Sequence, residues 1–63
     1  MITLDETPKK MSGGAYEIGF TGLSTDDKPT GTYDGKRIAN GSSFLEVDTH
    51  TVYFYDEEGA QWH

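Results

Sequence analysis

Alternating apolar and polar side chains predict β-strands in two parts of this chain. Residues 15–20 read AYEIGF, in which an apolar side chain occupies every second position. This period of two is typical of a strand with one buried face. Residues 42–48 (SSFLEVD) and 51–56 (TVYFYD) are rich in β-branched and aromatic residues, which favour strands. No segment has the i, i+3, i+4 apolar spacing of a helix, so the pattern predicts an all-β domain.

The two C-terminal segments predict an antiparallel hairpin. A two-residue turn at Thr49-His50 pairs Val47 with Val52 and requires a positive φ near His50. It gives one wholly apolar face, which we expect to form the core: Leu45, Val47, Val52 and Phe54. The opposite face is amphipathic: Phe44, Glu46, Asp48, Tyr53 and Tyr55. A three-residue turn would instead place Phe44 on the face of Phe54, and we favour the first register because it separates the two kinds of side chain more cleanly.

The rest of the chain completes a small β domain. Residues 1–14 mix charges with Pro8 and a Gly pair, and we expect an extended N-terminal arm, followed by the domain at residues 15–63. Residues 21–41 are rich in turn-forming Gly. Within them, residues 36–39 are expected to form a short strand, or residues 31–41 an ordered loop with Tyr33 against the sheet. The acidic turn at 56–59 lets the last residues return as a strand that brings Trp62 over the sheet. The predicted fold is therefore a three- to four-stranded antiparallel meander with a C-terminal hairpin and an extended N-terminal arm.

Length limits what this fold can do alone. A chain of 63 residues buries only about 60% of the surface of its unfolded form, so its core is thin. It contains no cysteine that a disulfide or a thiolate metal centre could use to reinforce the core. Domains of this size are commonly stabilised by oligomerisation or by docking on a partner, so we expect an assembly component rather than a free-standing enzyme.

Charge and hydropathy exclude two classes of partner. No stretch approaches the roughly 18 apolar residues of a membrane span, and the N-terminus lacks the apolar region of a signal peptide. Eleven acidic and five basic residues give a formal net charge of −6. This balance disfavours direct binding to nucleic acid, because few cations are present to neutralise phosphates. An acidic surface could instead imitate a phosphate backbone.

No catalytic or metal-binding pattern is present in the sequence. His50 and His63 have no cysteine partner at the spacing of a zinc site. The acidic pairs at 26–27 and 57–58 lie in loops, where neighbouring side chains point apart, and a chain this short hardly encloses a pocket. Asp26, Asp27 and Asp34 lack the ligand spacing of an EF-hand. We therefore expect no enzymatic activity, no cofactor, no metal and no small-molecule substrate.

The amphipathic face of the hairpin is the candidate binding site. Aromatic rings beside carboxylates suit recognition of a protein surface. The candidate partner-binding residues are Phe44, Glu46, Tyr53 and Tyr55 with nearby Tyr33. Two alternatives stay open: the face is covered by Tyr33, Tyr16 or the N-terminal arm of the same chain, or by a neighbouring subunit.

Three segments carry a resemblance to a known group of proteins. They are GLSTDDKPT at 22–30, NGSSFLEVDT at 40–49 and VYFYDEEGAQW at 52–62. They resemble short proteins encoded among the virion structural genes of tailed phages and prophages of Gram-positive bacteria. Such relatives usually carry Gly where this chain has His50, and residues 30–39 look like an insertion relative to them.

The resemblance implies a non-enzymatic structural or accessory component of a phage virion, made in the cytoplasm of the bacterial host. Its partners would be a larger phage structural protein, further copies of the same chain, or both. One alternative is a small acidic phage protein that inhibits a host defence or nucleic-acid-binding protein by charge mimicry, which requires its acids on one contiguous surface. A further alternative is a carbohydrate-binding module that stacks sugars on Trp62 and Tyr55.

Overall fold

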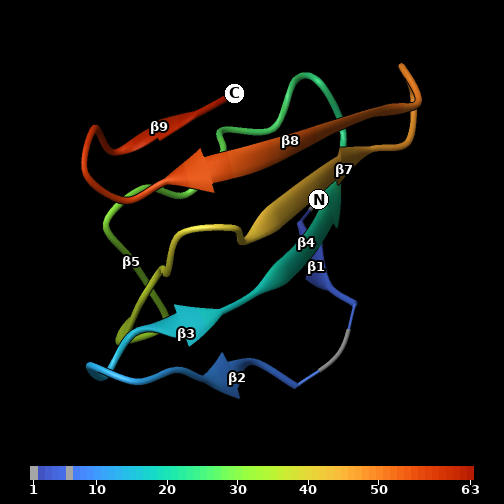
Figure 1. Cartoon of the computed structure of the whole chain (residues 1–63). Coiled ribbons are helices and arrows are strands. Elements are labelled where there is room, and N and C mark those ends of the chain that lie inside the picture. Colours follow the sequence, from blue (N-terminus) through green and yellow to red (C-terminus); the bar gives the residue numbers. More distant parts are fainter. Residues whose placement is uncertain (1, 6) are drawn as a thin grey trace.

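The computed structural model describes residues 2–5 and 7–63, and Figure 1 shows these residues arranged as strands joined by turns and loops. The described residues contain no helix, so the prediction of an all-β fold is confirmed for them. With no helix in this part of the chain, none is long and apolar enough to cross a membrane.

Five strands form the central sheet. They lie in the order β1 (Thr3–Leu4), β4 (Gly19–Gly22), β7 (Ser43–Glu46), β8 (Thr51–Asp56) and β9 (Gln61–Trp62). Two small antiparallel pairs flank this sheet: β2 (Lys9–Lys10) with β3 (Tyr16–Glu17), and β5 (Thr32–Tyr33) with β6 (Lys36–Arg37). Nine short strands thus arise in the described residues, more than the three or four expected.

One strand pair departs from the predicted meander. β4 and β7 are parallel, with Phe20 opposite Phe44, whereas the other pairs of the sheet are antiparallel. Parallel neighbours cannot be joined by a tight turn and need a long connection. Residues 23–42 provide it and contain the β5–β6 hairpin. We call residues 23–42 the crossover segment.

The first 14 residues, which we predicted to be an arm, contribute two strands. Thr3 and Leu4 of β1 pair with β4, and the backbone N–H of Asp5 continues this ladder to Gly19 at 2.8 Å. β2 pairs with β3. Residues 3–5 and 9–11 are therefore hydrogen-bonded to the rest of the protein.

The C-terminal hairpin is present, but its register differs from both predicted ones. Glu46 pairs with Thr51 and Phe44 with Tyr53, which leaves residues 47–50 in the turn. The turn is longer because its side chains bind elsewhere: Thr49 Oγ1 donates to Glu46 at 2.7 Å and Asp48 accepts from Ser24. His50 has the predicted positive φ, 58°. A shift of two residues keeps every side chain on its face, so the two faces separate as predicted.

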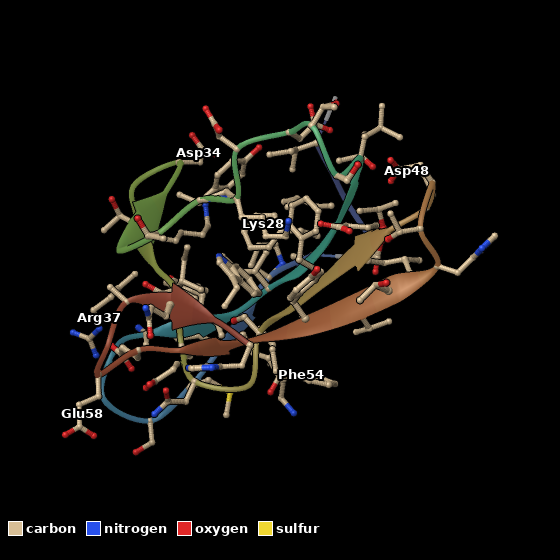
Figure 2. All side chains as sticks on the ribbon, turned by 90° about the horizontal axis from the view of Figure 1, so that it is seen from above. Lys28, Asp34, Arg37, Asp48, Phe54 and Glu58 are labelled. Carbon is tan, nitrogen blue, oxygen red and sulfur yellow. The ribbon has the colours of Figure 1, made fainter. Side chains whose placement is uncertain are left out.

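The core lies on the opposite side of the hairpin from the one we predicted. The buried cluster consists of Ile18, Phe20, Ile38, Phe44 and Tyr55. The four residues expected in the core are outside it: Val47, Val52 and Phe54 are 45%, 48% and 57% exposed, and Leu45 is half-buried. The reason is that the crossover segment covers the Phe44 side. Figure 2 shows Lys28 of this segment on one side of the sheet and Phe54 on the other.

Two hydrogen bonds hold the crossover segment on the sheet, one of them donated by Trp62. Trp62 Nε1 donates to the carbonyl of Pro29 at 2.8 Å, and the N–H of Gly31 donates to the hydroxyl of Tyr55 at 2.8 Å. The Trp62 ring lies 4.9 to 6.0 Å, between ring centroids, from those of Phe20, Phe44 and Tyr55. The prediction that the last strand returns Trp62 over the sheet is thus confirmed.

Candidate functional site: the uncovered face of the sheet

The five predicted partner-binding residues lie mostly inside the protein. Phe44 is fully buried, Glu46 and Tyr55 are 4% exposed, and Tyr33 and Tyr53 are half-buried against the core cluster. The cover that this face requires comes from the same chain, as one of the alternatives held. Only Tyr33 and Tyr53 offer part of their surface to a partner, and binding by these residues stays a prediction.

Lys28 and Glu46 form the most buried charged pair among the described residues. Lys28 Nζ lies 2.5 Å from Glu46 Oε2, and their side chains are 18% and 5% exposed. The ammonium also lies 4.9 Å from the centre of the Phe44 ring and 4.6 Å from that of Tyr53, within the range of cation–π attraction. The hydrogen bond from Lys28, followed by that from Thr49, lowers the pKa of Glu46 below its ordinary value of 4.5.

A second link joins the crossover segment to the β7–β8 turn. Ser24 donates to Asp48 from its backbone N–H at 2.9 Å and from its hydroxyl at 2.5 Å. These two bonds from Ser24 lower the pKa of Asp48 below its ordinary value of 3.8. Together with the Lys28–Glu46 pair, this link fixes the crossover segment at the turn end of the hairpin.

The residues that carry the phage-protein resemblance therefore meet in space. Ser24 and Lys28 come from the first resembling segment, and their partners Asp48 and Glu46 come from the second. Gly22 fits the same arrangement, because a Cβ at this position would lie 2.8 Å from the Phe44 ring. In this chain their contacts join the crossover segment to the β7–β8 hairpin.

The opposite face of the sheet has no covering segment among the described residues. Its centre consists of the apolar residues that we expected in the core: Leu45, Val47, Val52 and Phe54. Strand alternation places further residues around this centre: Asp5, Glu17, Gly19, Thr21, Ser43, Asp56 and His63. We call this surface the open face. The sequence pattern identified its central residues but assigned them to the core.

The polar surroundings of the open face are mainly acidic. Asp5 accepts a hydrogen bond from the Thr21 hydroxyl, Glu17 lies opposite Lys9 in the β2–β3 pair, and Asp56 Oδ2 is 3.6 Å from His63 Nε2. A hollow of about 140 Å³ is lined on this side by residues that include Asp5, Glu17 and Ser43. It is smaller than the roughly 300 Å³ at which ligand pockets begin.

Other candidate chemistry finds no geometric support in the described residues. They contain no group of three or more His, Asp or Glu side chains that could hold a metal ion. Trp62 is half-buried and Tyr55 is buried, so neither presents a free ring face for a sugar. Asp34, Asp48 and Glu58 lie at three separate corners of the protein in Figure 2. The single acidic surface required for charge mimicry is thus not formed by these residues.

Comparison with known proteins gives no match: the chain matches no protein-family model, no curated protein and no solved structure. The resemblance to phage proteins described above therefore stays a prediction.

Proposed function

We propose that this protein is a non-enzymatic assembly component that binds a larger protein through its open face. The observation that carries the proposal is the exposure of Phe54, Val52 and Val47, by 57%, 48% and 45%, on the face of the sheet away from the core. A single exposed apolar residue is ordinary, but a contiguous apolar group with polar surroundings is characteristic of protein–protein contacts.

The size of the core supports the same proposal. Five large side chains make up the buried cluster of the described residues, and domains of about this length gain little stability from such a core. A partner that binds only the folded state adds stability in proportion to its affinity and concentration. Covering the open face would in effect give the sheet a second apolar layer, which the chain itself does not provide.

We further propose, from the resemblance of its three segments, that the assembly is the virion of a tailed phage. In this proposal the protein is made in the cytoplasm of the bacterial host and is then incorporated into the particle. Its partner is a larger virion structural protein, and it contacts neither nucleic acid nor membrane. The net charge of −6 is in keeping with a protein that does not bind nucleic acid.

Quantitative mass spectrometry of purified particles tests this assignment. Particles produced by cells that encode this chain are expected to contain it in many copies, whereas a host protein of similar abundance in the lysate is lost during purification. Abundant protein in the lysate but none in the particles would contradict the virion assignment.

A further inference from the structure

The charges around the open face indicate what kind of surface it can bind. Three carboxylates surround its apolar centre, those of Asp5, Glu17 and Asp56. Within the described chain, Lys9 is the lysine that strand register places on this side, opposite Glu17. An apolar centre with acidic surroundings is complementary to apolar side chains flanked by lysine or arginine, because opposite charges bring partners together and like charges reject them.

A second copy of this chain is a poor occupant for electrostatic reasons. A two-fold symmetric dimer places the same surface against itself, so the acidic surroundings of one copy would meet those of the other. Each copy also has a net charge of −6, which adds repulsion.

The small area of the apolar centre also argues against a second copy of this chain as the occupant of the open face. Phe54 is 57% exposed, which corresponds to about 100 Å² for a side chain that buries roughly 150–250 Å² in full. With the two valines the centre offers on the order of 250 Å², below the roughly 450 Å² of apolar area per partner in a standard stable interface, of which about 57% is non-polar. A surface of this size suits a short segment better than a second globular face.

We propose, resting on the function proposed above, that the open face binds a short segment of the partner protein that is both apolar and basic. An apolar side chain of the segment packs on Leu45, Val52 and Phe54. Lysine or arginine side chains on either side of it pair with the surrounding carboxylates of Asp5, Glu17 and Asp56.

A titration with two synthetic peptides tests this inference. Both peptides have a Val-Phe-Leu centre, flanked on each side by two lysines in one and by two glutamates in the other. The lysine peptide is expected to shift the backbone amide NMR signals of Leu45, Val52 and Phe54 in a saturable way, and to bind more weakly as salt is added. The glutamate peptide is expected to bind at least about tenfold more weakly. Equal binding of both peptides, no binding of either, or a dimer formed through this face would overturn the inference.

Two sets of variants separate the apolar and the charged contributions. Phe54→Asp should lower the affinity for the lysine peptide about tenfold or more, as loss of a central anchor does. The double variant Asp5→Asn/Glu17→Gln neutralises two carboxylates of the open face and should also weaken binding of the lysine peptide. The matched double variant Asp27→Asn/Asp34→Asn changes net charge equally but lies in the crossover segment, on the other side of the sheet from Phe54, and should bind as the wild type does. Unchanged binding by Asp5→Asn/Glu17→Gln, in a protein with a dispersed NMR spectrum, would overturn the role of the carboxylates.

These results are distinguishable from a failure of the proposed function. If the particles contain the protein but the lysine peptide does not bind, the inference about the segment is wrong and the virion role stands. If the peptide binds but the particles lack the protein, the virion role is wrong and the chemistry of the open face stands.

Discussion

At the scale of single residues, pairing with Lys28 allows the Glu46 carboxylate to be buried beside a small apolar core. Burying a charge is costly unless it is paired and hydrogen-bonded. Glu46 has both kinds of partner, the ammonium of Lys28 at 2.5 Å and the hydroxyl of Thr49 at 2.7 Å. Every buried side-chain nitrogen and oxygen of the described residues has a hydrogen-bond partner, so the polar groups of this thin core are satisfied.

The lowered pKa of Glu46 predicts how stability depends on pH. A carboxylate whose folded-state pKa lies below its unfolded value of 4.5 contributes stability that is fully present above pH 4.5 and is lost as pH falls through the folded-state pKa. Glu46→Gln removes this contribution. The variant should unfold at lower urea concentration than the wild type at pH 7, and the two midpoints should converge as pH falls below 4.5.

The corresponding control is Glu58→Gln. This side chain is exposed, and no side-chain hydrogen bond or ion pair of Glu58 occurs among those of the described residues. Its midpoint should follow that of the wild type across the pH range. A difference between Glu46→Gln and the wild type that stays constant down to pH 3 would contradict the account of the Lys28–Glu46 pair.

At the scale of elements, the β7–β8 hairpin has one face in the core and one on the surface. Phe44 and Phe54 lie on the two sides of the same sheet, one fully buried and one 57% exposed. The more apolar face is the one left uncovered, because the crossover segment is fixed on the other side by Lys28, Pro29 and Gly31.

Two matched truncations test which face is the core. Phe44→Ala removes a ring that packs against those of Phe20 and Trp62, and such a change costs about 3–5 kcal/mol in a core. A domain of this length has a total stability of roughly 3–9 kcal/mol, so the variant should be largely unfolded. Phe54→Ala should change the free energy of unfolding by less than about 1 kcal/mol, since exposed positions contribute little. Urea unfolding followed by circular dichroism measures both, and the reverse order of effects would place the core on the other face.

The sequence predicts those features of this architecture that depend on neighbouring residues, and it does not predict those that depend on contacts between distant residues. Alternation identified β4, β7 and β8 and sorted the hairpin residues onto two faces, because side-chain direction in a strand depends only on position. Alternation does not say which face is covered. That depends on Lys28 reaching Glu46 across 18 positions of sequence and on Pro29 meeting Trp62, and neither contact leaves a pattern along the chain.

The parallel pairing of β4 with β7 could not be predicted for a related reason. Phe20 and Phe44 are brought together by a crossover segment that has no helix, whereas parallel strands are usually joined by one. Without that signal, consecutive strands are expected to pair as a meander. For the same reason the sequence did not show that the face expected to bind a partner is the one that this segment covers, so that Phe44, Glu46 and Tyr55 are buried.

At the scale of the whole molecule, the described protein is a five-stranded sheet flanked by the β2–β3 pair, with the crossover segment and its β5–β6 hairpin over one face. Its shortest dimension is 15 Å, against 33 and 24 Å for the others. Its accessible surface of 4039 Å² agrees with the value of about 4,000 Å² that folded monomers of this mass have. The chain is therefore as compact as a folded monomer while leaving the apolar centre of the open face in solvent, and this combination is what the proposed function explains.

The central claim, that the open face holds the protein in its assembly, is tested most directly by counting copies per purified particle. The comparison is between the wild type, Phe54→Asp and Thr30→Asp, where the last adds the same charge at an exposed position of the crossover segment. Many copies of the wild type and of Thr30→Asp are expected, and at least about tenfold fewer copies of Phe54→Asp. Particles without the wild-type protein, or with Phe54→Asp at the wild-type copy number, would contradict this claim.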